Sequence, residues 1–228
     1  MSDRPMKAMI LAAGLGSRMR PLTETCPKPL LKAGGKPLID YHLEKLAQAG
    51  VREVVVNSAW LSEQILDYLG DGQRYGLSIL HSPESEPLET AGGIVKALPL
   101  LGDDPFILVN GDIWTDMDFA PLTSISPASA HLFLTVNPAH NPAGDFSISS
   151  QGALAERDDD ALTFMGVSVW QPAVFAELAQ GKRALKPIID TLIAEQRATA
   201  SAFHGQWWDI GTPERLAALD DFLQKESA

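Results

Sequence analysis

Four short apolar runs in the first half of the chain alternate with segments whose apolar residues recur at helical spacing. Runs of this length that stop at glycine or polar residues are typical of buried strands. We expect these strands at 6–13, 52–59, 77–82 and 105–112. We expect helices between them at 37–50, 61–70 and 90–101. The alternation favours an α/β fold, with a Rossmann-like, mostly parallel sheet flanked by helices on both faces.

The second half of the chain follows a different pattern. Strands are expected at 131–138 and 161–170, and the segment between them predicts a hairpin over 145–156 that turns at Gln151 and Gly152. The remaining predicted elements are helices at 172–180 and 186–196, a strand with a turn over 199–212, and a helix at 213–226. Because no linker or internal repeat is visible, we expect a single domain over 1–228 whose second half adds an antiparallel lobe.

The charge of the chain is unevenly distributed. The formal net charge is −11, but residues 1–36 hold seven Lys and Arg against two Asp and Glu, a net of +5, which leaves −16 for the rest. A net negative charge disfavours nucleic acid and anionic membranes as partners, whereas a local basic segment suits a small anion. No apolar run reaches the length of a membrane span, and the N-terminus lacks the features of a signal peptide. Cys26 is the only cysteine, which is consistent with a cytoplasmic protein.

The basic residues gather in a glycine loop directly after the first expected strand. Gly14 and Gly16 allow a sharp turn, and consecutive backbone amides in such a turn form an anion site. Arg18 and Lys28 add positive charge suited to phosphate oxygens. The loop is not a dinucleotide fingerprint, because Met19 stands at the third glycine position, and this disfavours a nicotinamide dehydrogenase. On these residues alone, a structural turn and a phosphate site both remain open.

The loop is part of a longer series of motifs. In chain order, the motifs are "LAAGLGSRMRPLT", "PKPLLKAGGKPLI", "LETAGGI", "VNGD", "FMGVSVW" and "WWDIGTPERL". Together they resemble the signature of the sugar-1-phosphate nucleotidylyltransferases, and they cover essentially the whole chain. The resemblance implies the fold of nucleotide-diphospho-sugar transferases, with a nucleotide-binding half over about 1–115 and a sugar-binding half over about 116–228. It also implies a reaction in which a sugar 1-phosphate attacks the α-phosphorus of a nucleoside triphosphate and pyrophosphate leaves.

The resemblance assigns roles to individual residues. Lys28 and Arg18 would contact the triphosphate and stabilise the transition state, so both are expected to be catalytic. The residues expected to bind the nucleotide are Leu11, Ala12, Ala13, Gly14, Gly16, Glu89, Thr90, Gly92 and Gly93. Asp112 and Asp209 match the two metal-binding aspartates of the family, and carboxylate oxygens suit Mg²⁺ as the cofactor.

The sugar side carries the one departure from the family pattern. The residues expected to bind the sugar phosphate are Asn110, Gly144, Glu156, Arg157 and Gly166. Many relatives have a lysine after this glutamate, and that lysine holds the phosphate of the sugar. In this chain Arg157 takes the position, so either Arg157 or another group is expected to bind that phosphate.

Three further sequence segments indicate which substrates to expect. "NSAWLSEQI", "EPLETAGG" and "LVNGDIWTD" are most similar to short members of the family and imply UTP and N-acetylmuramate 1-phosphate, hence a role in peptidoglycan recycling. The chain ends one helix after Asp209, so we expect no C-terminal acetyltransferase or β-helix domain. We expect a monomer or a small homo-oligomer.

Other functions stay open at this point. Within the family, the alternatives are a mannose-1-phosphate guanylyltransferase, a glucose-1-phosphate uridylyl- or thymidylyltransferase and, less favoured, a phosphocholine cytidylyltransferase. Outside catalysis, the alternative is a nucleotide-sugar sensor or scaffold subunit. That alternative is disfavoured because the chain keeps Arg18, Lys28 and both aspartates, whereas a non-catalytic protein is expected to lose at least one of them.

Overall fold

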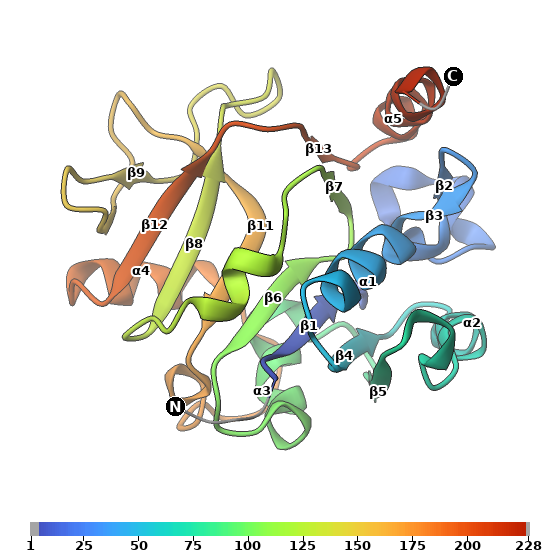
Figure 1. Ribbon diagram of the computed structural model, residues 1–228, viewed down its shortest axis with the longest axis horizontal. Helices are drawn as coiled ribbons and strands as arrows, with labels where there is room; N and C mark the ends of the chain where they lie inside the picture. The colour runs from blue at the N-terminus through green and yellow to red at the C-terminus, as the bar shows by residue number, and fades with distance from the viewer. Residues whose placement is uncertain (1–4, 227–228) are drawn as a thin grey trace.

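A seven-stranded sheet forms the centre of the computed structural model, which describes residues 5–226 (Figure 1). Its strands, in spatial order, are β12 (Ala198–Phe203), β8 (Ala130–Thr135), β11 (Thr163–Trp170), β6 (Phe106–Asn110), β1 (Lys7–Leu11), β4 (Glu53–Ser58) and β5 (Ser78–Pro83). Only β11 runs antiparallel to its two neighbours, and the other pairings are parallel. The expected mostly parallel sheet is therefore confirmed.

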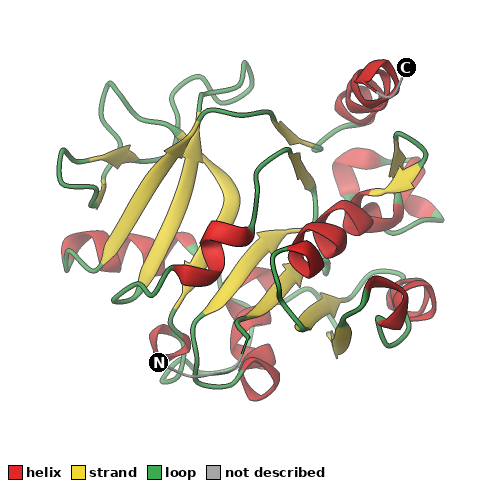
Figure 2. Ribbon diagram, viewed as in Figure 1, coloured by secondary structure: helices red, strands yellow, loops and turns green. Residues whose placement is uncertain are grey.

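Helices cover both faces of this sheet (Figure 2). The α-helices are α1 (Leu38–Gln48), α2 (Ser62–Leu69), α3 (Glu89–Leu101), α4 (Lys186–Ala194) and α5 (Pro213–Glu226). Because side chains alternate along a strand, Ala8 and Ile10 of β1 pack in one core cluster with α1 and α2, whereas Met9 packs in the other with α3 and α4. Both clusters are formed of fully or nearly fully buried apolar residues, so the sheet is a rigid platform for groups at its ends.

A small two-stranded sheet joins the two halves of the chain above the main sheet. Strands β7 (Ile113–Thr115) and β13 (Trp207–Asp209) pair antiparallel, with Asp209 opposite Ile113. The pairing continues for one residue, because the Ile210 amide donates to the Asp112 carbonyl at 2.9 Å. Helix α5 follows β13 directly and buries Leu216 and Leu219 in a third core cluster. The sequence did not predict β7, whose pairing holds Asp112 close to Asp209.

The remaining elements are short. The two-residue strands are β2 (Lys32–Ala33), β3 (Lys36–Pro37), β9 (Ser147–Ile148) and β10 (Leu154–Ala155). The 3-10 helices are η1 (Ser17–Met19), η2 (Leu22–Glu24), η3 (Lys28–Leu30), η4 (Gln73–Tyr75), η5 (Ala120–Ser124) and η6 (Pro172–Val174). Strands β9 and β10 form the predicted hairpin. The predicted helix at 172–180 is wrong: only η6 forms there, and the chain then turns. Within 5–226, no helix is both long and apolar enough to cross a membrane.

Candidate active site

Nine predicted site residues line one cavity of about 370 Å³. They are Leu11, Ala12, Ala13, Gly14, Lys28, Glu89, Thr90, Asn110 and Asp112. The cavity lies beyond the carboxyl ends of β1 and β6, which end at Leu11 and Asn110, as expected for ligands of an open parallel sheet. Its volume falls in the range of small-molecule sites. The structure therefore brings the predicted nucleotide side together with Lys28 and one of the two aspartates.

The glycine loop encloses a second hollow of about 280 Å³ that shares Gly14, Lys28 and Asp112 with the first. Gly16 and Arg18 line this hollow. Gly16 adopts φ +60°, and a Cβ atom there would lie 2.8 Å from the Thr23 side chain, so the turn requires glycine. The Thr23 hydroxyl donates to the Gly16 carbonyl at 2.7 Å, which fixes the turn.

Lys28 forms a short ion pair at the wall between the two hollows. Its Nζ atom donates to Oδ2 of Asp112 at 2.6 Å. Only 10% of the Lys28 side chain is exposed, compared with 39% of the Asp112 side chain. A nearly buried ammonium group interacts strongly with anions because little water screens it. Lys28 lines both hollows, so its charge is available to an anionic group bound in either of them.

A buried amide that the sequence did not single out, on Asn57, lines the first cavity. Asn57, at the end of β4, accepts a hydrogen bond from the Ala12 amide at 2.8 Å and donates to Glu84 at 2.7 Å. The other oxygen of Glu84 accepts from the Leu88 amide at 2.9 Å, just before α3. This network ties the end of β1 to the start of α3. The sequence signal that could have indicated Asn57 is its position as a polar residue directly after the apolar run "VVV".

Neither Gly92 nor Gly93 lines the cavity described above. A Cβ atom on Gly92 would lie 2.3 Å from the Gly181 carbonyl oxygen, and one on Gly93 would lie 2.7 Å from Nδ2 of Asn57. The structure thus uses both glycines for close internal packing. The Arg183 carbonyl accepts from the amides of Ala91 and Gly92, at 3.0 and 3.1 Å, and so satisfies the start of α3.

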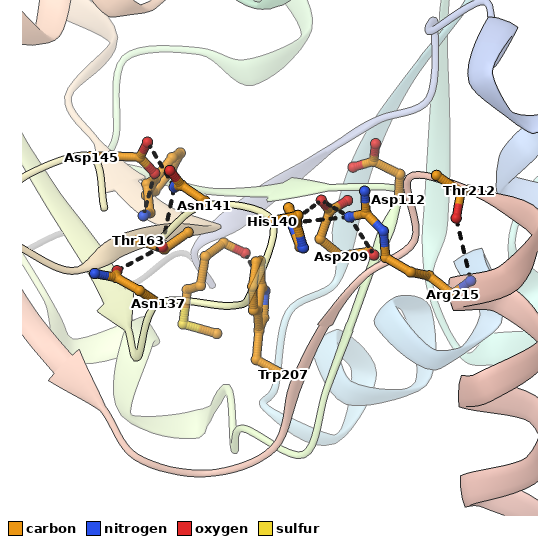
Figure 3. Close-up of polar contacts among 12 residues, drawn as sticks. Asp112, Asn137, His140, Asn141, Asp145, Thr163, Trp207, Asp209, Thr212 and Arg215 are labelled. Carbon is orange, nitrogen blue, oxygen red and sulfur yellow. Dashed lines mark hydrogen bonds and ion pairs between the residues drawn. The ribbon is translucent and has the colours of Figure 1, made fainter. Parts of the chain in front are cut away.

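The two aspartates face a third hollow of about 260 Å³, which also contains His140 and Asp145 (Figure 3). Nη1 of Arg215 donates to Oδ2 of Asp209 at 2.5 Å and to the Asp209 carbonyl at 3.2 Å. Nε2 of His140 lies 3.0 Å from the same carboxylate oxygen. The side chain of Asp209 is therefore oriented by groups from α5 and from the loop after β8. Neither Arg215 nor His140 was predicted as a site residue.

The donor chemistry of this hollow fits a hard divalent cation. Among residues 5–226, no three His, Cys, Asp or Glu side chains form a metal site by themselves. Asp112 and Asp209 supply two carboxylates, and Mg²⁺ is commonly held by one or two carboxylates with substrate phosphates and water completing its shell. The residues thus suit a metal whose binding is completed by substrate.

A chain of hydrogen bonds fixes one wall of the same hollow (Figure 3). Asp145 accepts from Nδ2 of Asn141 at 3.1 Å and from the Phe164 amide at 2.9 Å. The Thr163 hydroxyl donates to Asn137 at 2.8 Å and accepts from Asn141 at 3.2 Å. The Asp145 carboxylate is thereby held in one orientation with acceptor capacity left for a ligand. The sequence drew attention to its neighbour Gly144 but not to Asp145.

The other predicted sugar residues differ in position. Gly166 adopts φ +78°, and a Cβ atom there would lie 2.7 Å from Nδ2 of Asn110, so it packs directly against a cavity residue. Gly144 adopts φ +66° and packs against the Ala161 carbonyl, next to Asp145. Glu156 and Arg157 are exposed in the loop after β10 and line none of the hollows described here. The structure does not bring this pair to the other predicted residues.

Comparison with known proteins identifies the family. The family model described as "Nucleotidyl transferase" matches residues 7–226. The chain belongs to the nucleotidyltransferase family. This family consists of enzymes that move nucleotidyl groups, so the resemblance drawn from the sequence motifs is confirmed and a nicotinamide dehydrogenase is excluded.

Two relatives of this nucleotidyltransferase match over nearly their full length. N-acetylmuramate alpha-1-phosphate uridylyltransferase of Neisseria meningitidis serogroup B is 49% identical over 220 residues, which cover 92% of this chain and 95% of the relative. The protein of the same name from Caulobacter vibrioides is 34% identical, over 96% and 97% of the two chains.

Solved structures show the same fold at lower sequence identity. A Bacillus anthracis protein assigned as glucose-1-phosphate thymidylyltransferase, in complex with a sucrose, superposes with a TM-score of 0.86. The two chains are 22% identical, and the match covers 96% of this nucleotidyltransferase and 95% of the other chain. HddC from Yersinia pseudotuberculosis, complexed with GMP-PN, gives a TM-score of 0.77 at 22% identity, over 95% and 99% of the two chains.

Proposed function

We propose that this nucleotidyltransferase transfers a uridylyl group from UTP to N-acetylmuramate 1-phosphate, giving UDP-N-acetylmuramic acid and pyrophosphate in peptidoglycan recycling. The observation that carries the proposal is the 49% identity to the Neisseria meningitidis uridylyltransferase, because it extends over 92% of this chain and 95% of that relative. The Caulobacter vibrioides relative supports the same pair of substrates. We further propose a cytoplasmic enzyme, a monomer or small homo-oligomer, with its nucleotide site in the half over about 1–115 and its sugar site in the half over about 116–228.

In this proposal Lys28 is the main catalytic residue. An ammonium group has three N–H donors, and one is directed at Asp112, so two remain for phosphate oxygens. Arg18, on the rim of the glycine hollow, adds a second cation beside the turn at Gly16. Phosphoryl transfer depends chiefly on positioning and charge stabilisation, because it leaves little covalent chemistry for the protein to do. These two side chains and the loop amides supply both requirements for the triphosphate.

Asp112 and Asp209 are proposed to hold Mg²⁺ in the third hollow. When bound there, the cation would neutralise charge on phosphate oxygens of both substrates and favour in-line attack. Arg215 and His140 are proposed to keep the Asp209 carboxylate oriented, as outer groups commonly do around metal ligands. The Asp145 carboxylate is proposed to accept hydrogen bonds from the sugar, since the Asn141 side chain and the Phe164 amide already donate to it and fix its position.

The proposal is tested by pyrophosphate release with Mg²⁺, across UTP, dTTP, CTP, GTP and ATP. Each nucleotide is paired with the 1-phosphates of N-acetylmuramate, N-acetylglucosamine, glucose and mannose, and with phosphocholine. We expect the highest kcat/KM for UTP with N-acetylmuramate 1-phosphate and a product with the mass of UDP-N-acetylmuramic acid. A higher value for another pair would replace the substrates while keeping the chemistry. No release with any pair would favour the non-catalytic alternative.

A further inference from the structure

We propose that Lys186 is the specificity residue for the carboxylate that distinguishes muramate from other amino sugars. The inference rests on the proposed function. N-acetylmuramate 1-phosphate differs from N-acetylglucosamine 1-phosphate only by a lactyl ether, which adds one carboxylate. Removing that charge from water without a partner is costly, so an enzyme that prefers the muramate is expected to offer a cation there.

A separate hollow on the sugar side has room for the lactyl group. It measures about 470 Å³ and shares Glu89, Thr90 and Asn110 with the nucleotide cavity, so the two adjoin each other. Its other lining residues are Asp145, Phe146, Phe164, Ala184, Leu185, Lys186 and Ile189. Most of these side chains are apolar and suit the methyl groups of lactyl and acetamido substituents. Lys186 is the one cation among the residues that line this hollow within the described chain.

Three charged side chains line this hollow: Glu89, Asp145 and Lys186. Glu89 also lines the nucleotide cavity. Asp145 also lines the hollow of the two metal-binding aspartates, whereas Lys186 does not. Asp145 therefore lies on the side nearer the proposed metal site, where we expect hydroxyl and amide donors of the sugar. The Lys186 ammonium lies 5.2 Å from the centre of the Phe146 ring, which also lines the hollow. This position suits a carboxylate carried on the far side of the sugar.

The present partner of Lys186 is easily exchanged. Its Nζ atom contacts Oδ1 of Asp190 at 2.5 Å, one turn along α4, but the two side chains are 60% and 49% exposed. Exposed ion pairs of this kind contribute little to stability, so a substrate carboxylate competes on nearly equal terms.

Several other basic side chains at the site already contact acidic residues. Lys28 contacts Asp112, and Arg215 and His140 contact Asp209. Lys182 lines the nucleotide cavity and lies 3.7 Å from Glu89.

Lys182 is a matched control, because it has a similarly exposed side chain (66%) and an acidic neighbour but lines a different cavity. The test compares wild type, Lys186→Ala, Lys186→Arg and Lys182→Ala, using N-acetylmuramate 1-phosphate and N-acetylglucosamine 1-phosphate at saturating UTP and Mg²⁺. We expect Lys186→Ala to lower kcat/KM for the muramate at least tenfold and to change that for N-acetylglucosamine 1-phosphate less than twofold. Lys186→Arg should retain most of the preference, and Lys182→Ala should change both values in the same proportion.

A loss shared by both acceptors in Lys186→Ala, or no loss at all, would overturn the inference. A preference lost in Lys182→Ala instead would also overturn it. Circular dichroism and thermal unfolding confirm that the variants are folded. If turnover of N-acetylglucosamine 1-phosphate is too slow, calorimetric dissociation constants of UDP-N-acetylmuramic acid and UDP-N-acetylglucosamine provide the same comparison. A wild type with no preference for the muramate would refute the proposed substrate itself, which is a different outcome.

Discussion

Lys28 donates a hydrogen bond from Nζ to Oδ2 of Asp112 across 2.6 Å, so an ion pair joins the loop after β1 to the end of β6. The two residues are 84 positions apart in the chain, and the parallel pairing of β1 with β6 brings their loops to one edge of the sheet. The proposed cation for the triphosphate and a proposed metal ligand are thus adjacent.

The first prediction concerns this lysine. Lys28→Ala should lower kcat/KM about 100- to 1,000-fold, because a preorganised charge at the phosphates is lost. Steady-state pyrophosphate release measures the effect, and thermal unfolding checks the fold. Lys32→Ala, at an exposed position on β2 outside the described hollows, is the matched control and should stay within twofold of wild type. Near-normal turnover of Lys28→Ala would remove Lys28 from the catalytic role.

The second prediction concerns the metal. EDTA should stop pyrophosphate release, and added Mg²⁺ should restore it. Asp112→Asn and Asp209→Asn should each raise the Mg²⁺ concentration for half-maximal activity at least tenfold, because each loses a charged ligand. The exposed Asp103→Asn serves as the control and should match wild type. Turnover that persists in EDTA would contradict the two-aspartate site.

The third prediction concerns the buried amide of Asn57. Asn57→Ala leaves the Ala12 amide and one Glu84 oxygen without their partner, so the free energy of unfolding should fall by about 1–3 kcal/mol. The KM for UTP should rise as well, since the network fixes one wall of the nucleotide cavity. Urea unfolding and UTP titrations measure the two effects.

Gln224→Ala, an exposed amide on α5, is the control for Asn57→Ala and should change stability by less than about 0.5 kcal/mol. An Asn57→Ala protein as stable as wild type would show that the network contributes nothing.

The fourth prediction concerns His42, which is fully buried on α1. Burial lowers its pKa from the ordinary value of 6.5 to about 4. Between these values the unfolded chain binds the proton and the native protein does not. The stability that neutral His42 contributes is therefore complete above about pH 6.5 and lost as pH falls toward 4, a total of about 3 kcal/mol.

The measurement for His42 is the free energy of unfolding of wild type and His42→Gln between pH 4 and pH 7.5. The difference between the two proteins should depend on pH only below about 6.5. The exposed His204→Gln should follow the wild-type curve. Parallel curves for wild type and His42→Gln would contradict a neutral, buried imidazole.

Much of the fold could be predicted because each main strand is a compact apolar run with a clear stop. The strands around β1 and the helices α1 to α3 lie close to their expected ranges. The predicted helix at 172–180 failed for a physical reason. Short helices depend on tertiary packing, and here η6 is followed by turns that lead to Arg183, whose carbonyl satisfies the start of α3.

The sequence predicted which residues of the candidate site would come together where each belongs to one local motif. Lys28 and Asp112 each belong to such a motif, and the parallel sheet determines that they meet. Asn57 and Arg215 escaped prediction because their importance comes from partners, Glu84 and Asp209, that only the folded chain brings near. The pairing of β7 with β13 was also not predicted, because strands of three residues are too short to show a periodic pattern in the sequence.

The most direct test of the account is the ratio of kcat/KM for N-acetylmuramate 1-phosphate to that for mannose 1-phosphate and glucose 1-phosphate, with UTP and Mg²⁺ and the product identified by mass. We expect UDP-N-acetylmuramic acid as the product and a ratio of at least 100. A ratio near or below one, or efficient turnover only with GTP or dTTP, would contradict it.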